Sequence, residues 1–267
     1  MHVQLLAILD KKLENSVVKF SKLPFQTTVF NLNLYAHILN NNATMLKTRI
    51  DFLETVNLIP ADNAYYKQEI LIYHDLKGFQ SNPDRIPDDQ ALNIIQQTIT
   101  DHLARTDDQQ PPVVPIFQHY NSSFEVMLLT GISILDKESS TAVSLLHQLG
   151  MPISLIEFNA FRPAYLTQLL DAYQNNTSIS LTKLSAEFGK SYKQLQKDSK
   201  LYFGTTLHNF VLKLKMLDTI DDLMLTDLTL KEIAFKNNFT DYSSMYKLFN
   251  KQYNFPLQQI PRFLNLI

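Results

Sequence analysis

The chain of 267 residues contains no cysteine. Disulfide bridges, thiolate nucleophiles and zinc sites built on cysteine are therefore excluded together. It also lacks any apolar run near the roughly eighteen residues needed to cross a bilayer. The first residues, MHVQLLAILDKKLE, have neither a basic segment nor a small-residue cleavage site, so we expect no signal peptide. These absences favour a cytoplasmic protein that does not enter the membrane.

Signals for catalysis or cofactor binding are equally scarce. The whole chain has five glycines, and none of them belongs to a glycine-rich phosphate loop. The histidines show no H-x-H or H-x-x-x-H spacing, so surface or core roles are expected instead of metal binding. We therefore expect no catalytic residue, no metal site and no cofactor. The histidines are His2, His37, His74, His102, His119, His147 and His208.

The composition is that of a folded protein with an uneven charge distribution. Hydrophobic residues make up 45% and charged residues 19% of the chain, which argues against disorder. Residues 178–267 contain 12 Lys and Arg against 8 Asp and Glu, a net charge of +4, whereas the remainder of the chain has a net charge of −6. A polyanionic partner would therefore meet the C-terminal part.

The region 16–76 carries the alternation that is typical of β-strands. Apolar and polar residues alternate strictly over 30–38, and again over 46–52, with the asparagines at 40–42 as a turn between them. The segment 69–76 gives a third run. The alternating apolar face of the first run consists of Phe30, Leu32, Leu34, Ala36 and Ile38.

The pattern changes to helical spacing over 88–173. A first helix is predicted from a stripe at spacings of three and four, formed by Leu92, Ile95, Ile99 and Leu103. Further helices are predicted over 139–150, ending at Gly150, and over 163–174. We interpret Glu125 as a helix edge. The polar segment 174–178 is the expected domain junction, which gives domains 1–175 and 176–267.

Beyond Ser180 nearly every residue fits a helix. A short helix with a stripe at Leu181, Leu184, Ser185 and Phe188 ends at Gly189, and a second helix begins behind Ser191, a good N-cap. The plan then repeats. Thr229 and Glu232 form a T-x-x-E capping box, and Asn238, 49 residues after Gly189, stands where the turn needs a residue at positive φ.

Two short helices joined by a tight turn form a helix-turn-helix, and the pattern predicts this unit twice. The segment between the units, TLHNFVLKLKMLDTIDDLML, has the spacing of one long helix. A rigid helix would fix the two units relative to each other. Their second helices could then enter successive major grooves of a duplex, about 34 Å apart.

The sequences LTKLSAEFGKSYKQL and DLTLKEIAFKNNFTDYSSMYKLFNK resemble the DNA-binding domain of the AraC/XylS family of bacterial transcription regulators. The resemblance covers residues 179–255. It implies an α+β chain, with an N-terminal cupin-like small β-barrel and helices for sensing or dimerisation, before an all-α domain with two helix-turn-helix units. Relatives that repair alkylated DNA need a reactive cysteine, so the chain is not expected to be an enzyme.

The resemblance also assigns residues to DNA binding. Base-reading positions fall on Lys193, Gln196 and Lys197 in the first unit, and on Tyr242, Ser243, Tyr246 and Lys247 in the second. Lys200, Lys213 and Lys251 are candidates for phosphate contacts, which position the protein without reading sequence. Neither second helix contains arginine. We therefore expect few bidentate guanine contacts and an A·T-rich site.

The sequence departs from the family pattern at four positions. Asp198 and Ser199 replace apolar residues and are expected to weaken the core beneath the first reading helix. Asn254 replaces glycine, and the proline is displaced to Pro256, which puts the geometry of the C-terminus in question.

These observations predict a sequence-specific regulator that binds double-stranded DNA, with activation expected because family members usually activate. Control would come through the N-terminal domain, by a small apolar ligand or a protein partner. The family implies RNA polymerase as a partner and leaves a homodimer open, with the stripe at Leu92 as one candidate dimer surface. The alternative is a protein-interaction module that titrates another regulator and no longer reads DNA.

Overall fold

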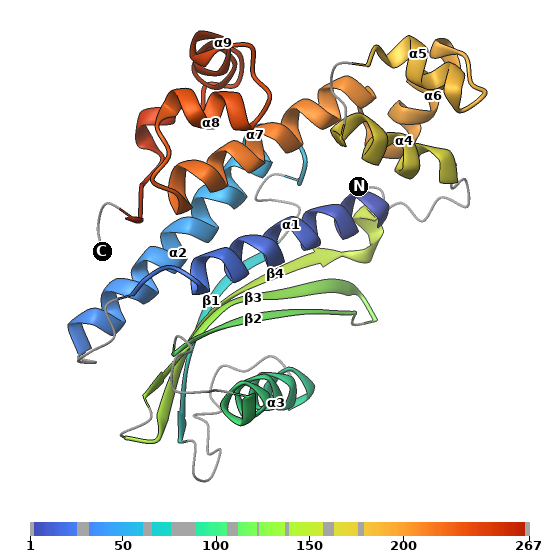
Figure 1. Cartoon of the computed structure of the whole chain (residues 1–267). Coiled ribbons are helices and arrows are strands. Elements are labelled where there is room, and N and C mark those ends of the chain that lie inside the picture. Colours follow the sequence, from blue (N-terminus) through green and yellow to red (C-terminus); the bar gives the residue numbers. More distant parts are fainter. Residues whose placement is uncertain are drawn as a thin grey trace.

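The computed structural model describes residues 3–25, 32–60, 66–75, 89–105, 112–121, 123–136, 139–156, 163–175 and 179–264. Figure 1 shows a sheet with helices on both faces, and an all-helical C-terminal region above it. Among these residues, no helix is both long and apolar enough to cross a bilayer.

The N-terminal region is built on one antiparallel sheet in the order β1-β4-β3-β2. Its strands are β1 (Tyr66–Asp75), β2 (Val113–Asn121), β3 (Glu125–Asp136) and β4 (Thr141–Pro152). Helices α1 (Val3–Ser21) and α2 (Leu32–Thr55) cover one face, and α3 (Asp89–Arg105) covers the other (Figure 1). The strand at 66–75 agrees with the prediction for that segment. The described strands form an open sheet, so the cupin-like barrel is not confirmed.

The prediction of strands across 16–76 was wrong for most of that range. Residues up to Ser21 continue α1, and 32–55 form α2, so the expected turn at 40–42 lies inside a helix. The alternation over 30–38 is local, whereas the buried positions of α2 recur at helical spacing from Ile38 to Leu53. The longer period determines the fold because it gives one continuous buried face. Its buried apolar members are Ile38, Met45, Leu46, Ile50, Phe52 and Leu53.

The prediction of helices across 88–173 was correct at its ends and wrong in the middle. Helix α3 and helix α4 (Ala164–Asn175) stand where expected, but 139–150 lies within β4 and Glu125 begins β3. Strand β3 is buried from Val126 to Leu135 and β4 from Leu146 to Met151, so these stretches lack the alternation of a half-exposed strand. Gly150 therefore pairs within the sheet instead of ending a helix.

The stripe on α3 packs onto the sheet. Ile95 and Ile99 are buried in one cluster with Ile70, Val114 and other apolar side chains of the strands, and Leu103 packs against its edge. The stripe is therefore covered within the chain. Its proposed use as a dimer surface was wrong.

The C-terminal region is entirely helical and shares its core with the N-terminal helices. Its helices after α4 are α5 (Leu181–Glu187), α6 (Tyr192–Phe203), α7 (Leu207–Leu225), α8 (Leu230–Lys236) and α9 (Tyr242–Lys247). A single hydrophobic cluster includes Phe20 of α1 and Phe52 of α2 together with Leu217 of α7 and Phe249. Figure 1 shows α7 lying across α1 and α2 on the side away from the sheet.

Candidate nucleic-acid interface

Helices α5 and α6 form the first short helix pair. The Ser180 side chain accepts a hydrogen bond from the backbone N–H of Lys183, and Ser191 accepts one of 3.1 Å from Gln194. Between the helices, Gly189 has φ of +65° with open space where a Cβ would lie. No neighbouring atom would clash with a larger side chain at this position. Glycine is therefore explained by the positive φ that the turn needs and that other residues rarely adopt.

Helices α8 and α9 form the second pair in the same way. The capping box is complete, since Thr229 accepts from the N–H of Glu232 and the Glu232 carboxylate accepts from that of Thr229. Asn238 has φ of +55°, as expected for the residue that corresponds to Gly189. Asp241 caps α9 by accepting a 2.6 Å hydrogen bond from the N–H of Ser244. A π-helical turn, Leu248–Gln252, continues α9.

Helix α7 connects the two pairs. Its 19 residues span about 28 Å at ~1.5 Å per residue. It contacts α6 near one end and α8 near the other, and Figure 1 shows the two pairs at opposite ends of α7. Asp222 of α7 fixes α8 by accepting hydrogen bonds from Lys236 and Asn237, at 2.7 and 2.8 Å. The single long helix predicted from the sequence is confirmed.

The residues predicted on α6 lie mainly on its outward side. Lys193, Lys197 and Lys200 are exposed, whereas Gln196 is half-buried. Tyr192, which the sequence analysis did not single out, is 45% exposed at the start of the helix. Tyr192 is the first residue of α6, as Tyr242 is the first residue of α9. Comparing the two repeats in the sequence could therefore have identified it.

The residues predicted on and after α9 divide between exposed and half-buried. Ser243, Lys247 and Lys251 are exposed. Tyr242 and Tyr246 are half-buried, and their rings lie against each other with centroids 5.9 Å apart. This contact leaves the tyrosines less free to reorient than the lysines beside them.

Lys213 differs from the other predicted phosphate contacts. It lies on α7 and is half-buried, and this burial lowers the pKa of its ammonium group. Lys215, two residues further along α7, is also half-buried, and burial lowers the pKa of its ammonium group. Its Nζ atom lies 4.1 Å from the centre of the Phe239 ring and donates to the carbonyl of Asn238. Lys215 therefore stabilises the second turn, a role that sequence reasoning missed.

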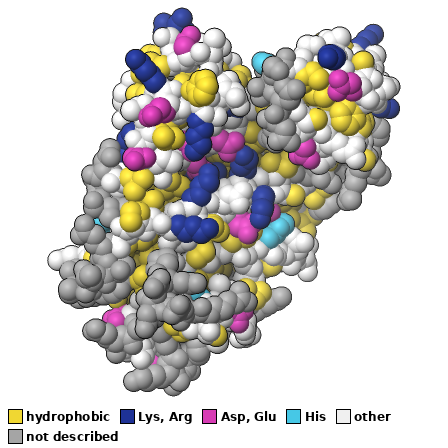
Figure 2. Space-filling model, in the orientation of Figure 1, with side chains coloured by type: hydrophobic (Ala, Val, Ile, Leu, Met, Phe, Trp, Pro, Cys, Tyr) yellow, Lys and Arg dark blue, Asp and Glu magenta, His cyan; other side chains and the backbone are white. Residues whose placement is uncertain are grey.

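Lysines also line a hollow beside the second pair, where α1, α7 and α8 meet. Figure 2 shows Lys and Arg side chains gathered on this face between the lobe of α8 and α9 and the lobe of α5 and α6. A hollow of about 260 Å³ is lined by Lys12 of α1, by Lys215 and Asp218 of α7, and by Lys236 of α8. Lys12 and Lys236 are each paired with an aspartate of α7, which reduces the positive charge available to a ligand there.

Asp198 does not weaken the core as expected from the sequence. It is buried, and both of its carboxylate oxygens accept hydrogen bonds of 2.6 Å, one from the Tyr165 hydroxyl of α4 and one from the Gln194 side chain. A buried carboxylate with both oxygens satisfied is compatible with tight packing. The hydroxyl of Ser199, also buried, has no hydrogen-bond partner among the described residues.

The altered C-terminus keeps the chain packed. Asn254 has φ of +50°, the conformation for which the family pattern uses glycine. The backbone N–H of Phe263 donates to the carbonyl of Met224 in α7 at 2.9 Å. Arg262 donates to the carbonyl of Leu228 at 2.7 Å. The segment after Pro256 is thereby attached to α7 and the start of α8.

The comparison with protein families agrees with this geometry. The family model of a helix-turn-helix domain matches residues 184–261. Among solved structures, that of the xylose-binding transcription activator XylR is similar, with 19% sequence identity and a TM-score of 0.33. That match covers 41% of this chain and 29% of the XylR chain, less than a third of the latter. A comparison with curated proteins gave no match.

The matched segment begins in α5 and extends past α9, so it contains both helix pairs and α7. It also contains most of the motif residues on which the sequence resemblance rests, from Leu184 to Phe249. Residues 184–261 therefore match a helix-turn-helix domain.

Proposed function

We propose that this chain is a sequence-specific transcription activator that reads DNA with α6 and α9, each the second helix of a helix-turn-helix unit. The observation that carries the proposal is the repeated design at the two ends of α7. Each pair has a capped first helix, a turn residue at positive φ and a capped second helix with exposed lysines. In a helix-turn-helix the second helix lies in the major groove and contacts base edges.

The length of α7 supports binding to one side of a duplex. About 28 Å of helix separates the attachment points of the two pairs, while successive major grooves on one side are about 34 Å apart. The offset of each reading helix from the α7 axis can supply the difference. One chain would therefore contact a long asymmetric site without a second copy.

The side chains on the reading helices suggest how contacts are divided. Gln196 is suited to adenine, which offers N6 and N7 to a side-chain amide. The exposed lysines, Lys193, Lys197, Lys200, Lys247 and Lys251, would contact guanine or phosphate oxygens. Tyr192, Tyr242, Ser243 and Tyr246 would complete the surface. Lys213 is half-buried, so its ammonium group would contact a phosphate only with the side chain extended. We retain the proposal of an A·T-rich site, since neither helix contains arginine.

Control of DNA binding would come from the N-terminal region, through a small ligand or a protein partner. Helices α1 and α2 pack directly on α7 within one hydrophobic cluster. A change in how these helices pack would therefore act on the element that spaces the two reading helices. Contact with RNA polymerase would follow from binding next to a promoter.

Fluorescence anisotropy with a site selected from random DNA tests the proposal. A reader that neutralises six to ten phosphates loses about 10³ to 10⁵ in affinity between roughly 50 and 200 mM salt. A scrambled duplex of the same composition is the control and should bind far more weakly than the selected site. If no sequence is enriched, and no salt-dependent binding appears, the titrating module described above replaces the proposal.

A further inference from the structure

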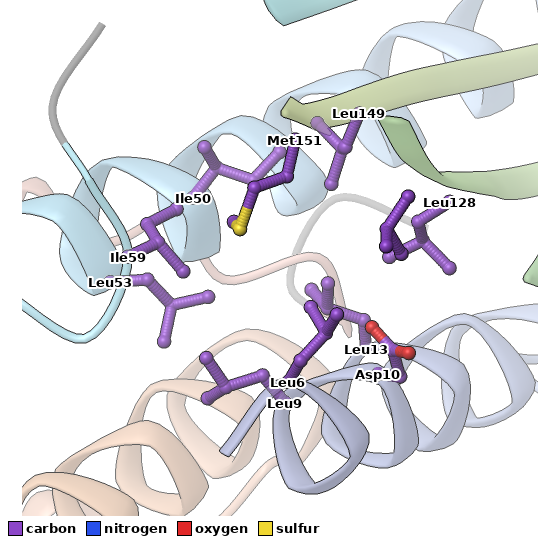
Figure 3. Close-up of a pocket in the computed structure, with 11 residues that line it drawn as sticks. Leu6, Leu9, Asp10, Leu13, Ile50, Leu53, Ile59, Leu128, Leu149 and Met151 are labelled. Atoms are coloured by element: carbon purple, nitrogen blue, oxygen red, sulfur yellow. The ribbon is translucent and has the colours of Figure 1, made fainter. Parts of the chain in front are cut away.

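A cavity lies between the two N-terminal helices and the sheet. It measures about 40 Å³ and is lined by Leu9 and Leu13 of α1, Ile50 and Leu53 of α2, and Leu128 and Met151 of the sheet, among others. Figure 3 shows these side chains converging on the cavity from the three elements. All of its lining residues except Asp10 are apolar.

Asp10 places a carboxylate in this apolar wall. The residue is 7% exposed, and Figure 3 shows its side chain on the same wall as Leu6, Leu9 and Leu13. The Oδ2 atom lies 2.9 Å from Nδ1 of His119 in β2, an ion-pair distance, and the His119 side chain is 38% exposed. A carboxylate has about four lone-pair sites, so Asp10 can accept a further hydrogen bond beside its ion pair with His119.

The opposite sides of the same two helices hold α7. On α1, Lys12 donates a 2.5 Å hydrogen bond to Asp218, and the Ser16 hydroxyl lies 3.1 Å from both oxygens of Asp221. On α2, Arg49 is fully buried and pairs with the same Asp221. The residues that hold α7 thus alternate along α1 and α2 with the residues that line the cavity.

We propose that this cavity binds a small apolar ammonium compound, a short primary alkylamine in its protonated form, whose ammonium group donates to Asp10. The charge of the carboxylate selects a cation, and the leucine and isoleucine walls select an alkyl chain. The chemistry excludes carboxylates and phosphates of similar size, since these would repel Asp10.

The size of the cavity connects binding to α7. A volume of about 40 Å³ holds roughly three water-sized spheres, which suits a chain of about three or four carbons. A longer chain fits only if α1 and α2 separate, because protein interiors are close-packed. Separation moves Lys12 and Ser16 relative to Arg49, and these three residues hold the aspartates of α7. This second step rests on the proposed DNA-binding function.

Isothermal titration of the full chain with n-butylammonium chloride tests the site, in an amine-free buffer with sodium chloride adjusted to constant ionic strength. Saturable binding is expected, with a dissociation constant at least tenfold weaker for n-butanol and no binding of n-butyrate. Asp10→Asn keeps the shape and removes the charge, and should weaken butylammonium binding at least tenfold. Leu128→Phe fills the cavity from the sheet and should abolish it.

Several results would overturn the site. These are an absence of saturation by butylammonium, equal binding of butanol, or wild-type affinity in the Asp10→Asn variant. Thermal unfolding of each variant without amine establishes that it is folded. The Leu128→Phe variant keeps Asp10, so it separates loss of space from loss of charge.

The link to DNA is measured separately on the same samples. Anisotropy with the selected DNA site is compared with and without n-hexylammonium, using sodium chloride of equal ionic strength as the control. At least a threefold change in DNA affinity is expected for the wild-type chain and none for Asp10→Asn. Amine binding without that change refutes the link to α7. Failure to bind DNA in the absence of any amine refutes the proposed function and leaves the cavity result standing.

Discussion

The hydroxyl of Tyr165 in α4 donates a 2.6 Å hydrogen bond to the Oδ2 atom of Asp198 in α6. Lys190, in the turn between α5 and α6, places its ammonium group 5.2 Å from the centre of the Tyr165 ring. Burial, followed by the hydrogen bond to Asp198 and the charge of that residue, raises the pKa of the Tyr165 hydroxyl. Helix α4 is therefore tied to α6 through one partly buried polar contact.

Removing this hydroxyl should destabilise the first helix pair. Tyr165→Phe leaves one oxygen of the buried Asp198 without a donor, which costs about 1–3 kcal/mol, and should weaken binding to DNA. Urea unfolding measures the first effect and anisotropy the second. Tyr73→Phe, at a side chain on β1 that is 57% exposed, is the matched control and should change stability by less than about 0.5 kcal/mol. Equal effects of the two substitutions would show that the Tyr165 contact contributes nothing.

The same contact illustrates what could be predicted from the sequence. The caps at Ser191 and Thr229 and the turns at Gly189 and Asn238 depend on residues within four positions of each other, so they were read correctly. The partner of Asp198 lies 33 residues earlier, on α4. Whether the oxygens of a buried carboxylate accept hydrogen bonds depends on such distant neighbours. The residues next to Asp198 in the sequence do not show this, so a weakened core was predicted.

The secondary structure of the N-terminal region was predicted wrongly for a related physical reason. Strands β3 and β4 are covered on both faces, by α1 and α2 on one side and by α3 on the other. Burial on both faces replaces alternation with continuous apolar runs, which short helices also show. The sheet register is set by pairing across the chain. Gly131 shows such a constraint across the sheet, since a Cβ there would lie 2.0 Å from the carbonyl oxygen of Leu145.

The two turn residues should respond differently to the same substitution. Gly189→Ala places a Cβ at φ of +65° and should cost about 1–2 kcal/mol, although no atom obstructs it. Gly189→Asn should cost less, because asparagine tolerates this conformation, and Asn238→Gly should be nearly neutral. Thermal unfolding of the three variants gives the order. An alanine variant as stable as the asparagine variant would contradict the strain argument.

Stability should depend on pH through Asp10. Burial raises its pKa from 3.8 to about 6 in the folded chain, and the charge of His119 opposes the rise. Since the folded state holds the proton more tightly, the stabilising contribution is complete below pH ~4 and is lost as pH rises through ~6. The loss is about 3 kcal/mol.

The Asp10→Asn variant isolates this effect, because asparagine imitates the protonated carboxyl group. Denaturant unfolding should give similar stabilities for the variant and the wild type near pH 4, and a more stable variant at pH 8. His119→Gln removes the opposing charge and is expected to raise the pKa of Asp10 further. A constant difference between wild type and Asp10→Asn across this range would mean that the carboxyl group titrates normally.

The lysines on the reading helices should contribute to DNA binding through charge. Lys197→Ala should lower the affinity for the selected site and reduce the slope of log affinity against log salt by about 0.9 if it contacts one phosphate. Anisotropy at four or five salt concentrations gives the slope. Lys11→Ala, at a side chain on α1 that is 66% exposed, carries the same charge change away from α6 and should leave the slope unaltered.

Removing one partner of the Arg49–Asp221 ion pair should strongly destabilise the chain, whereas replacing both partners by apolar residues should cost little stability. Arg49 is fully buried, and burial lowers its pKa to about 9 against the charge of Asp218, so the guanidinium remains charged near neutral pH. Asp221→Asn removes its buried partner and should cost about 3–5 kcal/mol. Lys19→Ala, which removes a half-exposed ammonium 3.5 Å from the same carboxylate, should cost less than about 1 kcal/mol.

The double variant Arg49→Met with Asp221→Leu decides what the pair does. Apolar residues of similar volume can replace a buried ion pair with little loss of stability, so urea unfolding should recover most of the deficit of Asp221→Asn. If α1 and α2 only support α7, this variant binds DNA like the wild type. If their packing controls α7, as proposed above, DNA affinity changes while stability does not. A double variant as unstable as the single one would instead show that the charges are needed for folding.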